Sequence, residues 1–430
     1  MRYVSTRGGA APVSLSSAIA AGLAPDGGLF VPEAMPRVGK LPTGGYLAST
    51  AAAMLEPFFD GDALAGDLEA ICAEAFTHPA PRRELRIAGA HLLELFHGPT
   101  AAFKDFGARF LAACIVRLRA QEDRPLTILV ATSGDTGAAV GAAFHGLPGV
   151  RVAILYPDNR VSPRQAHQLG SFGGNVRALR VEGSFDDCQR LVKGALGDPA
   201  LQADVPLSSA NSISLGRLLP QMAYFGHAAL HAEDGPMNVI VPTGNLGNAV
   251  ACLWAREIGL PIGEVVFACN ANDTLPEFFA GQPYRARDAV ATIANAMDVG
   301  APSNFERLSH LFGGEDQARQ NGSAHAIDDA TIRDTIRRHA ASDGEVFCPH
   351  TATAIRVFEQ RRLAGDPRPW TMAATAHPAK FDTIVEPLIG REVEVPEALA
   401  GMLRREAVAE PLAADGRLFA DWLRGWRGKA

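Results

Sequence analysis

Short apolar runs alternate with helix-like segments along the chain from about residue 126 onward. Four β-branched runs have the character of buried strands, at residues 127–130, 150–155, 239–241 and 265–268. Between residues 184 and 196 apolar positions recur at helical spacing, and Ser184 with Asp187 forms a helix start signal. Strands and helices in alternation predict parallel sheets joined by crossover helices, which is the α/β class.

The first 85 residues lack this alternation and predict a separate N-terminal domain, residues 1–85. They contain Ala-rich, helix-like stretches, a turn at residues 26–28 and a Pro-Ala-Pro linker at residues 79–81. Residues 86–430 are then expected to form a catalytic region of two α/β domains that are interleaved in sequence. Because such sheets bind ligands beyond the carboxyl ends of their strands, we expect a ligand in the cleft between the two domains.

Two stretches that could mislead are interpreted as ordinary structure. Residues 10–24 are Ala-rich and follow two arginines, but serines interrupt them and a turn follows, so they predict an amphipathic helix and not a secretory signal. Residues 321–323 predict an exposed loop. The sequence contains no run of about 18 uninterrupted apolar residues, so it predicts no membrane span.

Composition and charge narrow the functional class. The 430 residues are 47% hydrophobic and 20% charged, with a formal net charge of -7 and interspersed signs. Without a basic stripe, nucleic acid is not an expected partner. Six cysteines lie far apart with no C-x-x-C pair, which indicates reduced thiols in a cytoplasmic protein and predicts no metal site.

Lys104 is placed by the pattern in the first turn of a helix. Thr100 is the expected N-cap, and apolar residues follow at spacings of three and four, at positions 103, 106, 110, 114 and 118. The positive end of a helix dipole disfavours a cation by about 0.3 to 1 kcal/mol, which eases the deprotonation that imine formation needs. Taken alone, the residue would more often be a solvated surface lysine.

Two loops each join a predicted strand to a predicted helix. Residues 244–248, Gly-Asn-Leu-Gly-Asn, follow a strand ending near residue 243, and backbone N–H groups at such a junction converge on an anion. Residues 133–137, Ser-Gly-Asp-Thr-Gly, have the same position after another strand. Asp135 could simply cap the helix that begins at Thr136.

Thr375 ends the apolar run at residues 370–374 and is expected at the carboxyl end of a strand. Its hydroxyl could contact a ligand, although a threonine there is usually only a strand former. Arg217 lies in the segment at residues 211–221, and its planar fork suits phosphate oxygens. Its default interpretation is a surface ion pair.

Several of these segments together resemble the threonine synthase family. The resemblance covers residues 98–106, 211–221, 244–248 and 374–381, and extends from residues 3–7 and 23–32 to at least Phe381. It is closest to the bacterial and fungal branch. It implies a fold type II, tryptophan synthase β-like enzyme that uses pyridoxal phosphate (PLP) to convert O-phospho-L-homoserine and water into L-threonine and phosphate.

The same resemblance implies roles for individual residues. Lys104 would hold PLP and act as the general base. The PLP phosphate would lie on a loop of five residues: Gly244, Asn245, Leu246, Gly247 and Asn248. Thr375 would contact the pyridine nitrogen, and Asp135 would face the phenolic oxygen.

The substrate is assigned to other groups by the resemblance. Ser133, Gly134 and Thr136 would cradle its carboxylate, and Asn211 with Arg217 would bind its phosphate. Lys380 is a further candidate cation for that phosphate. Residues 296–307 also match a family segment and are expected to form a wall of the cleft, without a chemical role.

Two alternatives stay open at this point. One is another PLP lyase of the same fold, such as a hydroxyamino acid dehydratase or a phospho-lyase, and the segment at residues 211–217 with Lys380 discriminates against it. The other is a non-catalytic PLP-binding homologue, against which the intact Lys104 speaks. The sequence allows a monomer or a small homo-oligomer.

Overall fold

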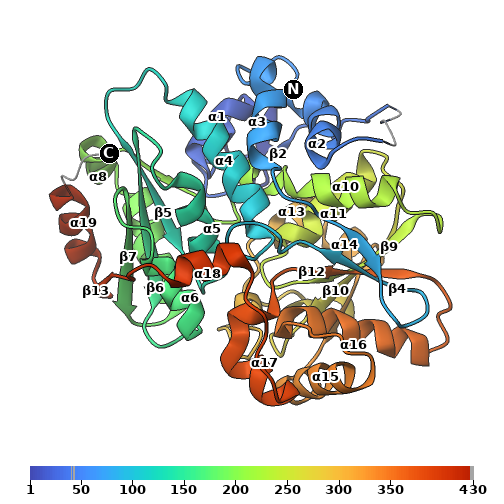
Figure 1. The fold of residues 1–430 in the computed structure, drawn as a ribbon. Helices are drawn as coiled ribbons and strands as arrows, with labels where there is room; N and C mark the ends of the chain where they lie inside the picture. The colour runs from blue at the N-terminus through green and yellow to red at the C-terminus, as the bar shows by residue number, and fades with distance from the viewer. Residues whose placement is uncertain (40, 42–43, 427–430) are drawn as a thin grey trace.

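Two parallel sheets, of six and five strands, form the frame of the protein (Figure 1). The computed structural model describes residues 1–39, 41 and 44–426. The six-stranded sheet has the order β11 (Ser323–Ala326), β10 (Ile262–Cys269), β9 (Met237–Pro242), β12 (Trp370–Ala374), β4 (Ala90–Glu94) and β3 (Arg82–Glu84). The five-stranded sheet has the order β13 (Ala409–Ala413), β7 (Val176–Glu182), β6 (Val150–Pro157), β5 (Leu126–Ala131) and β8 (Leu207–Ser209). Only β3 pairs antiparallel to its neighbour in these two sheets.

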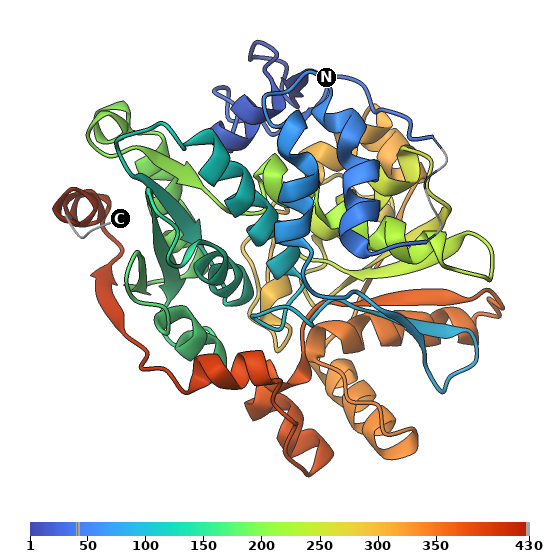
Figure 2. The ribbon, with the colours of Figure 1, turned by 45° about the horizontal axis from the view of Figure 1, so that its top comes forward.

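The two domains are interleaved, as the sequence predicts. The chain passes from β4 to the five-stranded sheet for β5 to β8, returns to the larger sheet for β9 to β12, and ends with β13 beside β7. The segment after α17 (Asp382–Ile389) crosses from the larger to the smaller domain through α18 (Glu397–Leu403) (Figure 2). All four predicted strands are confirmed, with somewhat longer bounds.

Both faces of each sheet are buried, which explains the continuous apolar runs. In β9, Val239 and Val241 belong to the core around α10 (Gln221–Leu230) and α11 (Gly247–Glu257), while Ile240 faces the core around α15 (Asp329–Ser342) and α16 (Pro349–Leu363). Because successive side chains of a strand point to opposite faces, such a strand needs apolar residues at every position.

The remaining helices cover the sheets and line the cleft. Those of the smaller domain are α5 (Asp135–Phe144), α6 (Pro163–Gly170), α7 (Phe185–Leu196), α8 (Pro199–Asp204) and α19 (Gly416–Gly425). Those between and beside the sheets are α4 (Lys104–Leu118), α9 (Leu215–Leu218), α12 (Thr274–Phe279), α13 (Phe305–Phe312) and α14 (Glu315–Gln320), with 3-10 turns η3 (Asn295–Met297) and η4 (Pro378–Phe381). The predicted start of α7 is confirmed, because Ser184 and Asp187 cap each other's backbone N–H groups.

The N-terminal part packs on α4 and α10 and forms the top of the view in Figure 1. It consists of β1 (Tyr3–Ser5), α1 (Leu15–Ala21), β2 (Phe30–Pro32), α2 (Leu47–Leu55), η1 (Glu56–Phe59), η2 (Ala65–Asp67) and α3 (Leu68–Ala75). The helix expected within residues 10–24 is therefore present as α1. The predicted domain boundary at residue 85 falls beyond β3, which already pairs with β4 in the larger sheet.

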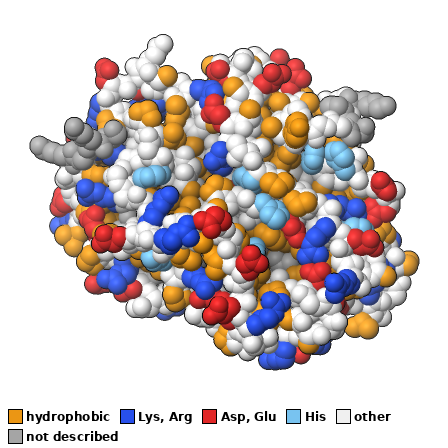
Figure 3. Space-filling view, in the orientation of Figure 1, with side chains coloured by type: hydrophobic (Ala, Val, Ile, Leu, Met, Phe, Trp, Pro, Cys, Tyr) orange, Lys and Arg blue, Asp and Glu red, His pale blue; other side chains and the backbone are white. Residues whose placement is uncertain are grey.

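The structure also bears on the predicted loop at residues 321–323, on the distribution of charge and on membrane-spanning helices. The loop expected at residues 321–323 is shorter than predicted, because Ser323 already pairs with Val266 at the start of the edge strand β11. Acidic and basic side chains are interspersed over the face shown in Figure 3, as the charge pattern of the sequence suggests. In the part of the chain that the structure describes, none of the helices has the length and apolar character needed to cross a membrane.

Arg307 in α13 fastens the N-terminal part to the cleft. Its buried guanidinium donates to the carbonyl of Phe30 at 3.0 and 3.1 Å, to the carbonyl of Ile213 at 2.8 Å, and to Asn304 Oδ1 at 2.8 Å. Burial lowers the pKa of Arg307 to about 9, and the fixed carbonyls stand in for the water that the cation has lost.

Arg307→Ala is expected to lower the free energy of unfolding by about 2 to 4 kcal/mol, because it leaves the carbonyls of Phe30 and Ile213 and the side-chain oxygen of Asn304 without this donor. Chemical denaturation of both proteins measures this change. The exposed Arg285 offers a matched control, since Arg285→Ala is expected to stay within about 0.5 kcal/mol of the parent. Equal stability of the two variants would contradict the fastening role of Arg307.

Candidate active site

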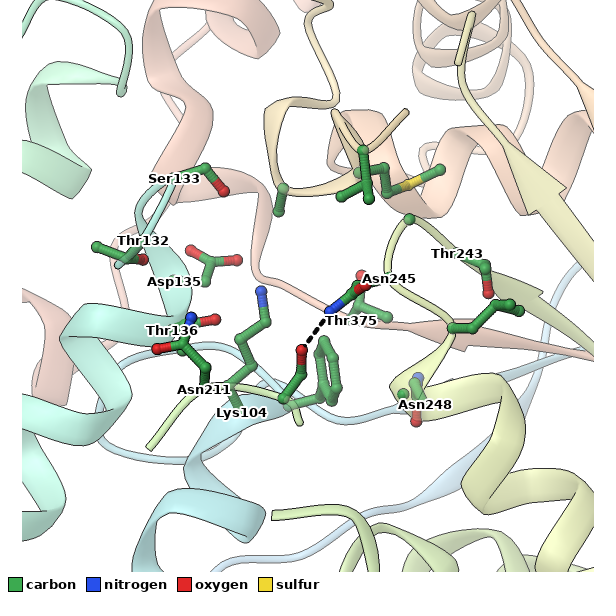
Figure 4. Close-up of a pocket in the computed structure, with 18 of the residues that line it drawn as sticks. Lys104, Thr132, Ser133, Asp135, Thr136, Asn211, Thr243, Asn245, Asn248 and Thr375 are labelled. Atoms are coloured by element: carbon green, nitrogen blue, oxygen red, sulfur yellow. Dashed lines mark hydrogen bonds between the residues drawn. The ribbon is translucent and has the colours of Figure 1, made fainter. Parts of the chain in front are cut away.

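A pocket with an empty volume of about 960 Å³ lies between the two sheets. Its walls are the segments that follow the carboxyl ends of β5, β9 and β12, together with the first turns of α4, α5 and α11. Twelve of the predicted site residues line it: Lys104, Ser133, Asp135, Thr136, Asn211, Arg217, Gly244, Asn245, Leu246, Gly247, Asn248 and Thr375. Gly134 and Lys380 do not line it. Most of these side chains are visible in Figure 4.

The helix that carries Lys104 begins differently from the prediction. Lys104 is its first residue, Phe103 is the N-cap, and Thr100 caps nothing. Instead, the Thr100 N–H and hydroxyl both donate to the buried Asp105 carboxylate, at 2.8 and 2.7 Å. The side chain of Asp105 thus shapes the turn before the helix, and the expected role of Thr100 as N-cap is wrong.

The Lys104 segment is fastened directly to the Thr375 segment. The Phe103 N–H donates to the Thr375 carbonyl at 2.9 Å, and the His377 N–H donates to the Ala101 carbonyl at 3.0 Å. These two bonds flank an antiparallel bridge between Ala102 and Ala376. Two segments that are about 270 residues apart in the sequence are therefore held in one fixed register beside the pocket.

Lys104 has an unusually acidic amine. Burial lowers its pKa to about 8, and Arg217 and Lys380 act in the same direction, while Asp135 opposes the shift. Figure 4 shows the amine extending into the pocket between Asp135 and Thr375. A lysine of this kind can supply a neutral amine for nucleophilic attack near neutral pH.

On the sequence-based expectation that Lys104 binds PLP, the apo-protein should take up PLP at a rate that rises with pH, with a midpoint near pH 8, because only a neutral amine can form that bond. Stopped-flow absorbance from pH 6 to 10 follows this reaction. In Asp135→Asn the midpoint should move to lower pH, since Asp135 raises the pKa of Lys104. A midpoint near 10.5, the ordinary lysine value, would contradict the assignment.

The loop at residues 244–248 is tightly held. Asn245 Nδ2 donates to Ser212 Oγ at 2.5 Å, a bond drawn in Figure 4, and Asn304 Nδ2 donates to the Asn245 carbonyl at 3.0 Å. A Cβ on Gly244 would lie 2.7 Å from Met297 Cα, so only glycine fits there. Leu246 has the left-handed φ of 61° directly before α11, and the first residues of that helix, Gly247 and Asn248, line the pocket.

Two buried polar atoms beside this loop lack a protein partner. Thr243 Oγ1 and Asn248 Nδ2 form no hydrogen bond within the described residues. The amide nitrogen can only donate, and it accompanies the free N–H groups of a helix start. This set suits an anionic group such as a phosphate, and the residues present therefore fit PLP.

Arg217 is not the surface residue of its default interpretation. Its side chain is buried, and its Nη1 donates to the Ala210 carbonyl at 2.5 Å. Burial lowers its pKa to about 10, and no ion pair of the described residues includes it. A Cβ on Gly107 would lie 2.7 Å from the Arg217 carbonyl, so that glycine makes room for it. Its Nε also forms no hydrogen bond within the described residues, so this buried guanidinium has the capacity to bind an anion.

Asp135 does not cap its helix. The N-cap of α5 is Gly134, with a φ of 134°, and Asp135 is the first helical residue without a capping bond. Its carboxylate accepts from Gln165 Nε2 at 2.9 Å and pairs with Lys380 Nζ at 2.9 Å. Burial opposes its ionisation, but Lys380 and Lys104 outweigh this and hold the pKa of Asp135 below its usual range.

Lys380 is a correction to the predicted site. Its side chain is fully buried, and its ammonium donates to the Thr100 carbonyl at 2.7 Å besides pairing with Asp135. With these two partners it lies behind the pocket wall and not in it. The sequence pattern could not distinguish a ligand-binding lysine from one that is paired with a carboxylate 245 positions away.

The loop at residues 133–137 and the nearby Asn211 are fixed by backbone contacts. Thr132 Oγ1 accepts from the Gly134 and Gly137 N–H groups at 3.0 and 2.9 Å, and Asn211 Nδ2 donates to the Ala131 carbonyl at 3.1 Å. Thr375 follows β12 as predicted, and its hydroxyl has no hydrogen-bond partner among residues 1–39, 41 and 44–426. It is therefore available to a ligand.

The sequence reasoning missed three side chains of this site. His350 lines the pocket, and burial lowers its pKa to about 4, so the ring is neutral and its Nε2 accepts from the Ala296 N–H at 3.1 Å. Gln165 joins Asp135 to Asn295, whose Nδ2 donates to Gln165 Oε1 at 3.0 Å. Two of the three carried a helix-start signal in the sequence: Cys348 and Pro349 precede His350, and Gln165 is the last residue of an S-x-x-Q capping box that begins at Ser162.

Within residues 1–39, 41 and 44–426, no three or more His, Cys, Asp or Glu side chains are grouped to hold an ion.

The fold and this pocket define a pyridoxal-phosphate-dependent enzyme of the α/β class. Residues 79–376 match the family model described as pyridoxal-phosphate dependent enzyme. The flanking residues 2–76 and 351–420 match the models for the threonine synthase N terminus and for the C-terminal part of threonine synthase.

Individual relatives agree along nearly the whole chain. Threonine synthase from Haemophilus influenzae is 39% identical over 396 residues, which are 90% of this chain and 91% of that protein. The crystal structure of threonine synthase from Escherichia coli superposes with a TM-score of 0.91 at 36% identity, covering 98% of this chain and 99% of that one. The PLP-bound threonine synthase from Brucella melitensis gives 0.89 at 36% identity, with 99% of both chains covered. The chain belongs to the threonine synthase family.

Proposed function

We propose that this protein converts O-phospho-L-homoserine and water into L-threonine and phosphate with the help of PLP. The proposal rests on one observation: the same pocket is lined by Lys104, whose pKa is lowered, and by two separate features that can bind an anion. One is the loop at residues 244–248 at the start of α11, and the other is the buried, unpaired Arg217.

The residues that would hold the cofactor lie on several elements. Lys104 would bind it through its ε-amino group, the loop Gly244, Asn245, Leu246, Gly247 and Asn248 would bind its phosphate, and Thr375 would donate to its ring nitrogen. Asp135 would stand beside the ring. When bound, PLP supplies an electron sink that stabilises negative charge developing on the substrate's carbon atoms.

The substrate would be oriented by groups on both domains. Ser133, Gly134 and Thr136 would cradle the carboxylate at the start of α5, and Asn211 with Arg217 would bind the phosphate that leaves from the γ carbon. Once its amine is free, Lys104 would remove the proton from the α carbon and then one from the β carbon, and water would later add at the β carbon.

The cellular location and the partners of the protein are also part of the proposal. All six cysteines are free and buried, which supports the reducing environment of the cytoplasm. We propose a small molecule as the partner, with neither nucleic acid nor membrane, and a monomer or a small homo-oligomer as the assembly.

The experiment is an incubation of the purified, PLP-loaded protein with O-phospho-L-homoserine. Phosphate and threonine should appear in a one-to-one ratio. If 2-oxobutanoate is the main product, the alternative of a lyase is correct. If PLP is bound but no phosphate is released, the protein is a non-catalytic homologue.

A further inference from the structure

An ion pair between Asp135 and Lys380 links the two domains directly behind the pocket. Asp135 begins α5 beside the five-stranded sheet, and Lys380 lies in η4 after the central strand β12 of the larger sheet. The two groups are 2.9 Å apart, and their side chains are 3% and 0% exposed. The Lys380 ammonium also donates to the Thr100 carbonyl at 2.7 Å, four residues before Lys104.

A contribution to folding stability does not by itself explain such a buried ion pair. Removing two charges from water is costly, and replacing a buried ion pair by neutral side chains of similar size is often neutral or stabilising. Asp135 is already held by Gln165 at 2.9 Å. The carboxylate lines the pocket while the ammonium does not, so the contact between this pair and a ligand would be made by Asp135 and not by Lys380.

We propose that Lys380 is a positioning residue that keeps the Asp135 carboxylate ionised and oriented at the pocket wall. The positive charge of Lys380 would then compensate the negative charge that Asp135 presents to the cofactor. The proposal rests on the proposed place of Asp135 beside the cofactor. A carboxylate near a phenolic oxygen would otherwise be a contact between like charges, which would drive one of the two groups to take up a proton.

The groups that face Asp135 support this division of roles. They are Lys380 from η4, Lys104 from α4, and His350 with the Cys348 thiol at the start of α16. His350 is neutral, because its Nε2 accepts a backbone N–H. Lys104 would give its amine to the cofactor. Of these four groups, Lys380 is the one in direct contact with the carboxylate.

The test is a pH titration of the visible absorbance of bound PLP in four proteins: the parent, Lys380→Met, Asp135→Asn and the double variant. In Lys380→Met the unpaired carboxyl should acquire a pKa raised by up to about 3 to 5 units. The absorbance should then show a transition between about pH 5 and 9 that the parent lacks. The double variant should lack it too, because no titrating carboxyl remains. Lys193→Met, the same change at an exposed lysine of α7, should match the parent.

The outcomes separate positioning from a merely structural role. If Lys380→Met melts at a lower temperature but keeps the parent's pH profile, Lys380 only holds the Thr100 carbonyl and the proposal is overturned. If Lys380→Met fails to fold, recovery of folded, PLP-binding protein in the double variant supports the proposal, and failure of both overturns it.

The thermal unfolding midpoints of the same four proteins without cofactor provide a second, independent test. The double variant should have a higher thermal midpoint than both single variants, since Lys380→Met removes the cation in direct contact with Asp135, and Asp135→Asn leaves the buried Lys380 ammonium without its carboxylate. A double variant no more stable than either would overturn the charge pairing. Absence of visible absorbance in the parent would instead refute the proposed function, and the midpoints would still decide on the pair.

Discussion

Replacing Lys104 by alanine is expected to lower the rate of threonine formation by about 10³-fold or more, because the same side chain would bind PLP and move the protons of the reaction. The geometry behind this expectation is the fixed register of the Lys104 and Thr375 segments and the lowered pKa of the amine. Phosphate release and threonine formation measure the rate.

Peptide mapping after borohydride reduction supplies the complementary result. The parent should carry the pyridoxyl mass on Lys104, and Lys104→Ala should carry it nowhere. Lys193→Ala, at an exposed position, should keep both the label and the activity. Finding the label on Lys193 or Lys380 would refute the assignment.

Arg217→Ala is expected to lower kcat/KM for O-phospho-L-homoserine by roughly ten- to a hundred-fold, which corresponds to the loss of about 1.5 to 3 kcal/mol from a hydrogen bond to a charged group. Because the leaving phosphate gains negative charge as its bond to carbon breaks, part of the loss should appear in kcat. PLP content and visible absorbance should stay near those of the parent, since the loop at residues 244–248 would serve the cofactor.

Two further variants serve as comparisons for this prediction. Arg217→Lys keeps the charge but not the planar fork, and should lie between the parent and Arg217→Ala. Arg285→Ala removes an exposed arginine and should leave turnover unchanged. Loss of PLP from Arg217→Ala would show that Arg217 serves the cofactor phosphate, and full activity would show that it binds no phosphate.

The parts of the fold that follow local rules could be predicted from the sequence. β5, β6, β9 and β10 are buried on both faces, so their apolar runs are continuous, and the start of α7 is encoded by Ser184 and Asp187. The loops at residues 133–137 and 244–248 were predictable for a related reason. A strand-to-helix turn that approaches a ligand needs small residues, and a Cβ on Gly244 would indeed meet Met297.

The parts that depend on distant partners could not be predicted. Thr100 looks like a helix cap in sequence, but Asp105 takes both of its donors. Asp135 also looks like a cap, yet its partner Lys380 is 245 residues away. Edge strand β13 and the pocket residue His350 depend on the same kind of long-range packing.

Turnover of O-phospho-L-homoserine in oxygen-18 water tests the central claim most directly, because the proposed reaction draws the new hydroxyl of threonine from solvent. Mass spectrometry should find one oxygen-18 atom in the threonine hydroxyl and none in the released phosphate, since the bond between carbon and oxygen is the one that breaks. Threonine without the label, or label in the phosphate, would contradict the account.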